Sequence, residues 1–247
     1  MNKLLFLALL IALTACSKRN DAPTPAQTRS SETPATAAIE PAKSDVPAGA
    51  YKLDKLHSSL LLRVNHLGFS NYVARFKTFD AQLQFDPNDP AAARVAVQVD
   101  PTSLDVENPP AGFLSELIGK GWLDTAQFPD LTFKSTSVEL TAPKAMRING
   151  DLTLHGVTRP IVLDATFNGG YIGHPMDPNA RIGFSAQGAF NRSDFGISYG
   201  IPAPGTTMGV SDRVEVNIET EFTGPPMQTA PGQTAPGQTA MDGADSK

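Results

Sequence analysis

The residues with the most reactive side chains are few and widely spaced. His57 and His66 lie nine positions apart on one predicted strand, which separates them by roughly 30 Å. They cannot share a metal ion unless that strand folds back on itself. His155 and His174 have no neighbouring His or Cys in the sequence. We therefore expect no metal site, with His57 and His66 bonded to backbone or solvent at opposite ends of the strand.

The sequence also contains no recognisable catalytic set. Serines are plentiful, but no G-x-S-x-G motif occurs, and no residues suggest a nucleophile with a base and an orienting acid. Asp194-Phe195-Gly196 matches a kinase tripeptide by chance, since the other kinase motifs are missing. We expect a tight turn there, with Arg192 and Asp194 paired locally. No catalytic residue and no cofactor is predicted.

Cys16, the single cysteine, follows a short targeting segment. Lys3 gives a basic start, and an apolar run of about ten residues from Leu4 to Leu13 is too short to span a bilayer stably. Residues 1–15 therefore read as a signal peptide. The small residues before Cys16 resemble a bacterial lipobox, in which the cysteine is acylated and anchors the mature protein. The alternative is an ordinary secreted protein with an incidental cysteine.

The two ends of the chain differ in composition from its middle. Residues 17–49 contain no aromatic residue and are rich in Pro, Ala, Thr and Ser, so we predict a lipidated cysteine followed by a disordered tether over 16–49. Residues 224–247 contain two copies of Thr-Ala-Pro-Gly-Gln and are predicted to form a low-complexity tail. One barrel domain is expected over residues 50–223.

The charge of the chain limits its partners. The net charge is −5, and residues 50–223 carry 14 Lys and Arg against 19 Asp and Glu. An acidic domain without a basic cluster argues against nucleic acid as a partner. It also argues against electrostatic docking on an anionic membrane surface.

The stretch 53–68 organises the domain. Leu60, Leu62 and Val64 alternate with polar residues such as Arg63, which predicts a half-buried β-strand. One apolar face of this length needs many partner strands to cover it. Further alternating runs occupy residues 72–85, 95–99, 131–140, 146–154, 161–167, 182–190 and 214–222, which makes eight strands.

Three details refine these strands. The apolar parity of residues 72–85 changes at Lys77–Thr78, which predicts a bulge. Gly150 follows Asn149, a common hairpin pair, but the alternation continues through it, so we place this glycine inside a strand. The connection to the next strand is expected over residues 155–160.

Residues 109–128 interrupt the strand pattern. Pro110 can start a short helix that runs through Ile118, and Gly119 and Gly121 would end it. This strongly apolar segment could be a lid over one end of a barrel or a plug that closes its core.

Eight antiparallel strands and one short helical segment predict an all-β fold, a closed eight-stranded lipocalin-like barrel, because a sandwich would leave edges to protect. The interior of such a barrel is just large enough for side chains or for one slim ligand. Periodicity alone leaves both a packed core and a ligand channel open.

Several motifs in order resemble the YceI-like family of bacterial polyisoprenoid-binding proteins. They are Tyr51-x-x-Asp54-x-x-His57-Ser58, Val64-x-His66-Leu67-Gly68, Phe128-Pro129-x-Leu131-x-Phe133-x-Ser135, the stretch from Gly150 to Arg159, and Arg192-x-Asp194-Phe195-Gly196. One departure is the helical segment, where family members often carry Arg-Asp and a His. This chain has Gly112-Phe113-Leu114-Ser115-Glu116 there.

The resemblance implies that the interior is a channel for a polyprenyl chain, such as the tail of an isoprenoid quinone or a polyprenyl phosphate. The expected function is the binding, storage or transport of this lipid by a protein anchored in the bacterial envelope. An enzyme acting on such a lipid and a stress-related module with a packed barrel are the alternatives. The residues expected to bind the lipid are Leu60, Leu62, Val64, Phe76, Leu83, Phe85, Phe113, Trp122, Leu152, Leu154, Ile182 and Phe184.

Overall fold

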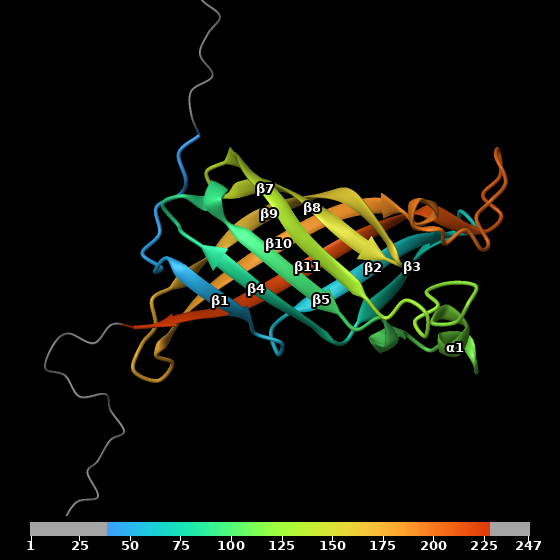
Figure 1. Cartoon of the computed structure of the whole chain (residues 1–247), viewed down its shortest axis with the longest axis horizontal. Coiled ribbons are helices and arrows are strands. Elements are labelled where there is room, and N and C mark those ends of the chain that lie inside the picture. The colour runs from blue at the N-terminus through green and yellow to red at the C-terminus, as the bar shows by residue number, and fades with distance from the viewer. Residues whose placement is uncertain (1–38, 228–247) are drawn as a thin grey trace, which may run out of the picture. The chain divides into compact units, whose positions relative to one another are not determined.

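The computed structural model describes residues 39–227. Eleven strands, one short α-helix and three 3-10 turns make up this part of the chain (Figure 1). No helix in it is long and apolar enough to cross a membrane. The elements are β1 (Gly49–Leu53), β2 (Ser59–His66), β3 (Ser70–Phe76), β4 (Phe79–Phe85), β5 (Arg94–Val99), β6 (Leu104–Val106), α1 (Phe113–Leu117), β7 (Leu131–Ala142), β8 (Ala145–Leu154), β9 (Val157–Tyr171), β10 (Asn179–Asn191) and β11 (Val210–Pro226).

The strands form a closed antiparallel barrel with eight strand positions. β1 and β2 occupy the first position, β3 and β4 the second, and β5 and β6 the third, because β1 pairs with β4, β2 with β3, and β3 with β6. Strands β7 to β11 fill the other five in chain order. The barrel closes where β11 pairs with both β1 and β2. The predicted eight-stranded barrel is confirmed.

The first strand position is broken into β1 and β2, and β2 covers most of the strand that alternation predicts from His57 to His66. The break lies at Asp54, whose carboxylate accepts the backbone N–H of Leu56 at 3.0 Å. The Ser58 hydroxyl donates to the Asp54 carbonyl at 2.8 Å. These local bonds replace the ladder with a turn. At Lys77–Thr78, where the sequence predicts a bulge, the structure has a break between β3 and β4.

The connection between β8 and β9 is shorter than predicted. Leu154 pairs directly with Val157, and the two residues between them have left-handed φ angles, 51° at His155 and 73° at Gly156. Two such residues make a tight hairpin turn. Residues 157–160, predicted to belong to the connection, are therefore in β9, which tolerates Pro160 opposite Asp151.

Gly150 lies inside β8, as predicted, opposite Ser135 of β7. The Phe133 ring crosses this position so closely that a Cβ on residue 150 would lie 2.3 Å from its Cζ. Glycine is thus required for the ring to lie across the strand.

One end of the barrel is packed with aromatic rings. Phe85 lies 5.6 Å from Phe167 and 5.6 Å from Phe184, measured between ring centroids. Tyr51 packs edge-on against Phe85, and Phe222 against Phe184. These rings fill the interior from wall to wall, so this end of the barrel is closed by its own core.

Segments predicted to flank the barrel contribute to this packed end. Val46 is only 4% exposed, and the Ala42 N–H donates to the Pro143 carbonyl at 2.7 Å. At the other terminus Gly224 lies in β11 beneath the Tyr51 ring. The barrel therefore includes residues 39–49 and 224–226, which the sequence assigns to the tether and the tail. Residues 1–38, which include Cys16, and residues 228–247 lie outside the described part of the chain.

The α1 segment lies at the end of the barrel opposite β1 (Figure 1). The predicted helix over residues 110–118 is shorter in the structure, because Gly112 adopts a left-handed conformation with a φ of 82° and α1 begins only at Phe113. Gly119 ends it, as its N–H bonds to the Glu116 carbonyl.

Candidate functional site

An apolar cavity of about 560 Å³ occupies the half of the barrel beyond the aromatic core. This volume lies within the range of roughly 300–1,000 Å³ that is typical of small-molecule sites. Its wall is built from the inward-facing rows of the strands and from the α1 segment. Among the described residues, the lining side chains with polar atoms are His66, Tyr72, Trp122, Thr132 and Arg192.

The predicted ligand-binding residues divide between the two halves of the barrel. Four lie in the packed half and do not line the cavity: Leu83, Phe85, Ile182 and Phe184. Alternation places them inward correctly, but it carries no information on how far along the barrel each residue lies. Eight line the cavity: Leu60, Leu62, Val64, Phe76, Phe113, Trp122, Leu152 and Leu154.

The ladder between the third and fourth strand positions is incomplete beside the cavity. β5 pairs with β7 only from Ala96 to Val99, and within residues 39–227 β6 pairs with β3 alone. The segment between β6 and β7 fills the resulting gap. Phe113, Leu117 and Trp122 from this segment line the cavity, so it forms a wall of the cavity rather than a plug that fills it.

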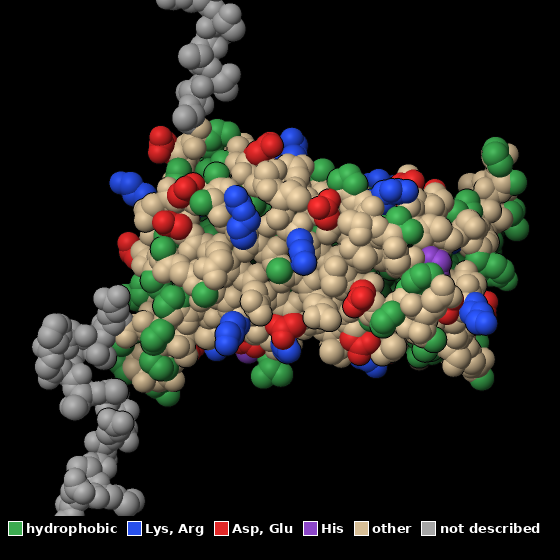
Figure 2. Space-filling view, viewed as in Figure 1, with side chains coloured by type: hydrophobic (Ala, Val, Ile, Leu, Met, Phe, Trp, Pro, Cys, Tyr) green, Lys and Arg blue, Asp and Glu red, His purple; other side chains and the backbone are tan. Residues whose placement is uncertain are grey.

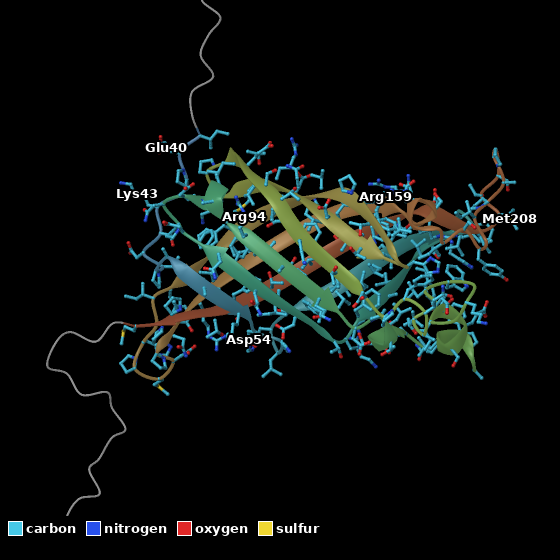
Figure 3. The ribbon with its side chains drawn as sticks, viewed as in Figure 1. Glu40, Lys43, Asp54, Arg94, Arg159 and Met208 are labelled. Atoms are coloured by element: carbon cyan, nitrogen blue, oxygen red, sulfur yellow. The ribbon has the colours of Figure 1, made fainter. Side chains whose placement is uncertain are left out.

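Exposed apolar side chains lie on two loops close to one another. Phe69, in the β2–β3 turn, is 81% exposed, and Met208, in the β10–β11 loop, is 67% exposed. The Leu67 N–H donates to the Gly209 carbonyl and holds the two loops together. Met208 lies at the α1 end of the barrel, far from Glu40 and Lys43 (Figure 3). The cavity end therefore has an apolar outer surface.

Arg192 is a buried cation on the cavity wall, an environment that its sequence motif did not predict. The predicted pairing of its side chain with Asp194 is not present in the structure. Arg192 is 4% exposed and donates to the carbonyls of Ser211, Ile197, Tyr199 and Val210 at 2.8–3.2 Å. Burial lowers the pKa of the guanidinium. Four backbone bonds compensate for the removal of this charge from water.

A simple pattern could have placed Arg192 correctly. In β10 the inward row runs through Ile182, Phe184 and Phe190 at even positions, and Arg192 continues this parity. The arginine therefore enters the barrel at the end of the row, while Asp194 turns outward. The motif alone suggested a local ion pair because it ignores the parity of the strand before it.

Trp122 combines an aromatic wall with an unused donor. The Arg192 guanidinium lies 5.0 Å from the centre of its ring, and Tyr199 packs edge-on against it at 5.6 Å. The indole Nε1 is buried and has no hydrogen-bond partner within residues 39–227. Leaving a buried donor unpaired costs about 1–3 kcal/mol.

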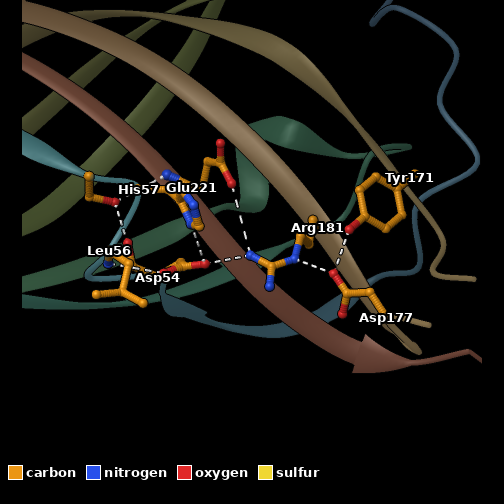
Figure 4. Close-up of polar contacts among 8 residues, drawn as sticks. Asp54, Leu56, His57, Tyr171, Asp177, Arg181 and Glu221 are labelled. Atoms are coloured by element: carbon orange, nitrogen blue, oxygen red, sulfur yellow. Dashed lines mark hydrogen bonds and ion pairs between the residues drawn. The ribbon is translucent and has the colours of Figure 1, made fainter.

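A second polar cluster lies on the outside of the barrel, at the break between β1 and β2 (Figure 4). Arg181 donates to Asp54 and, from Nε, to Asp177 at 2.6 Å. Hydrogen bonds from His57 and Arg181 hold the pKa of Asp54 well below its usual range, and the bond to Asp54 raises the pKa of His57. Asp54, His57 and Glu221 could approach one cation, but Arg181 already neutralises the same carboxylate.

From this cluster we expect a substitution at Asp54 to lower the stability of the fold by an amount that depends on pH. Asp54→Asn should lower the free energy of unfolding at pH 7 by about 1.5–3 kcal/mol, the range for hydrogen bonds to charged groups. A carboxylate with a lowered folded-state pKa stabilises the fold above the unfolded-state pKa near 3.9, and this contribution is lost as the pH falls below it. Urea denaturation from pH 7 to pH 2 should show the difference between variant and parent shrinking below about pH 4.

A matched control for this experiment is Asp164→Asn. Asp164 is 65% exposed and pairs only loosely with Arg147, at 3.6 Å. The Asp164→Asn substitution should change the free energy of unfolding by less than about 1 kcal/mol at every pH. Equal effects of the two substitutions would show that the Asp54 cluster does not hold the barrel together.

The fold and the cavity define the class: a lipocalin-like closed barrel with an apolar interior space. The YceI-like domain matches residues 51–222. The "UPF0312 protein" of Pseudomonas savastanoi pv. phaseolicola is 36% identical over 178 residues, which cover 70% of this chain and 86% of that protein. The chain belongs to the YceI-like family.

Solved structures show the same barrel. The Campylobacter jejuni YCEI protein is 30% identical and superposes with a TM-score of 0.55 over 65% of this chain and 90% of that one. A polyisoprenoid binding domain from Saccharophagus degradans superposes with a TM-score of 0.53 over 72% of this chain and all of that one. At 15% identity the second likeness concerns the fold alone.

Proposed function

We propose that this protein binds a polyisoprenoid lipid, with the prenyl chain in the cavity, and that it stores or transports this lipid in the bacterial cell envelope. The observation that carries the proposal is the apolar cavity of about 560 Å³ in a barrel whose other half is packed solid. The Saccharophagus degradans domain, which shares the fold, is a polyisoprenoid binding domain. The lipid is of the isoprenoid quinone or polyprenyl phosphate type.

The energetics favour a long apolar ligand. Each buried methylene-sized group contributes about 0.8 kcal/mol. Several isoprene units therefore outweigh an association cost of roughly 4–15 kcal/mol. The lining residues are almost entirely aliphatic or aromatic, so they offer the prenyl chain few directional contacts such as hydrogen bonds.

The surface charge agrees with this ligand class. Lys and Arg side chains are interspersed with Asp and Glu over the visible face of the barrel (Figure 2). Such a surface offers no basic track for nucleic acid. A binding role is also simpler than catalysis, because the polar side chains on the cavity wall do not form a nucleophile–base–acid set within residues 39–227.

Cys16 supplies the membrane attachment in this proposal. Acylation of the cysteine after removal of residues 1–15 would anchor the protein through its N-terminus, as two acyl chains hold a protein stably at a bilayer. Ser17 rather than Asp follows the cysteine, which favours the periplasmic side of the outer membrane.

A filled cavity can be tested at Leu62, which lies in the middle of β2 and lines the cavity. We expect Leu62→Trp to fold with a melting temperature near that of the lipid-free parent, because the indole occupies space left for the lipid. The variant should no longer copurify with an isoprenoid. Native mass spectrometry of the detergent-extracted protein shows whether the parent and the variant carry the lipid.

Leu61→Trp is the matched control, because Leu61 is the next residue of β2 and points to the opposite face. It should retain the lipid. If Leu62→Trp folds and retains the lipid, the ligand binds elsewhere. If it unfolds, the barrel is packed at both ends, since overpacking a filled core costs about 1–3 kcal/mol or more.

A further inference from the structure

Three segments at the α1 end of the barrel carry no Lys, Arg, Asp or Glu. Residues 195–211, which include the β10–β11 loop, form a run of 17 such residues. Residues 64–74, around the β2–β3 turn, and residues 108–115, which lead into α1, share this property. Charged side chains return only beyond these segments, for example at Asp194 and Asp212. The three segments therefore offer an ionic partner nothing to pair with.

Large apolar side chains are exposed on two of these segments. Phe69 and Met208 are mostly exposed, and so is the ring of Tyr199. The β10–β11 loop projects beyond the barrel (Figure 1), and hydrophobic side chains gather on it (Figure 2). The fold gains nothing from holding such groups in water, and clustered exposed apolar groups mark interaction surfaces.

The two exposed loops hold each other in place. The Leu67 N–H donates to the Gly209 carbonyl at 2.8 Å and joins the β2–β3 turn to the β10–β11 loop. A Cβ on Gly68 would lie only 2.9 Å from Oγ1 of Thr207, so the two loops are in direct contact. Their apolar side chains are therefore presented together by a fixed backbone, which lowers the entropic cost of binding a partner.

The apolar cavity reaches the base of these loops. His66 and Pro110 line the cavity and are also exposed to solvent. Between them, Tyr72 and Phe113 pack edge-on with ring centroids 6.3 Å apart, and both line the cavity. The apolar interior of the barrel and the apolar outer surface thus meet at one end.

A lipid bilayer fits this surface better than a protein does. Three side chains of this size bury on the order of 500 Å², which is less than the roughly 800 Å² per partner of a stable protein interface. A bilayer instead accepts projecting tips, because apolar side chains enter its interfacial region by about 5–10 Å. Tyrosine is also common at that depth. The uncharged loops remove the need for anionic lipid.

We infer that the α1 end of the barrel docks on the surface of a lipid bilayer, with Phe69 and Met208 inserted into its interfacial region. The cavity then faces the bilayer, so an apolar ligand can pass between the two without crossing water. This inference goes beyond the proposed function. It rests on the outer surface of the loops and not on the contents of the cavity.

A fluorescent label beside the loop contact tests the docking. The full-length Cys16→Ser chain has no thiol and cannot be acylated at residue 16, so Ser70→Cys adds a single site next to Phe69 for an environment-sensitive dye. With phosphatidylcholine vesicles the emission should shift to shorter wavelength, and lipids with spin-labelled acyl chains should quench it. The same dye at Met176→Cys should show neither effect. Met176 is 92% exposed, in the β9–β10 loop at the opposite end (Figure 1).

A matched pair of substitutions measures the contribution of one side chain. In the chain labelled at residue 70, Met208→Ser should shift the equilibrium between inserted and water-exposed label by about tenfold toward water. Met176→Ser makes the same chemical change at the other end and should leave this equilibrium unchanged. Both methionines are exposed, so neither substitution removes a core contact.

The outcomes separate the bilayer from other occupants of this surface. Equal burial of the labels at residues 70 and 176, no response to vesicles, or a response only to anionic vesicles would overturn the inference. A spectral shift that grows with protein concentration in the absence of vesicles would overturn it in favour of a second copy of the chain. None of these results bears on whether the cavity holds lipid, which Leu62→Trp tests separately.

Discussion

Phe85→Ala is expected to lower the free energy of unfolding by about 3–5 kcal/mol. Phe85 is 5% exposed and contacts the rings of Tyr51, Phe167 and Phe184, so its removal leaves a hole in the part of the barrel that is packed from wall to wall. Chemical denaturation of the purified protein, with and without bound lipid, measures the loss.

Phe76→Ala is the matched comparison at the other end. Phe76 is 6% exposed, but its side chain borders the cavity instead of a filled core. Phe76→Ala should lower the free energy of unfolding clearly less than Phe85→Ala does, because the removed ring borders the cavity. It should also reduce lipid retention, because the variant loses contacts with the ligand. Equal costs at the two positions would contradict a barrel that is half packed and half hollow.

Cys16→Ser is expected to abolish metabolic labelling with palmitate and to release the protein from membranes almost completely. Cys16 is the single thiol of the chain, so no other cysteine can carry the acyl chain. The acidic, mixed-charge surface gives little electrostatic attraction to anionic lipids that could replace an anchor. Fractionation of cells that express each variant measures the release.

Ser17→Ala serves as the control, since it changes the neighbouring residue and leaves the thiol in place. It should remain labelled and membrane-bound. If the Cys16→Ser protein still fractionates with membranes after a high-salt wash, the lipid anchor does not exist.

The barrel could be predicted from the sequence because each strand carries a simple alternation. One row in each of β2, β5, β8 and β11 is mostly apolar at every second residue, and a sheet can bury such a face by curling on itself. The breaks were harder to predict. At Asp54 a side chain competes with the ladder for the backbone N–H of Leu56, and alternation does not record such local bonds.

The site could be predicted only in part, for a geometric reason. Parity tells which face a residue occupies but not its height along the barrel axis. Leu62 and Leu83 have the same pattern, yet Leu62 lines the cavity and Leu83 belongs to the packed core. Height depends on the register between strands, which is set by pairings such as Tyr51 with Leu83 and Leu62 with Val216.

The polar end of the cavity depends on contacts that are distant in sequence. Trp122 meets Arg192 across seventy residues, and the carbonyls that hold Arg192 come from two different segments around Ile197 and Val210. No local motif contains both members of this contact. Only the inward parity of β10 pointed to Arg192.

The pairing of β11 with β1 and β2 also has a consequence for folding. The other ladders join neighbouring strand positions along the chain, so they can form from local contacts at a low entropic cost. The closing ladder joins the first strands of the domain to the last, at Leu53 with Phe222 and at Val64 with Val214. The barrel therefore cannot close during synthesis before β11 is available. Loss of β11 would not shorten the barrel but would leave a curved sheet with two exposed edges, at β10 and at β1–β2.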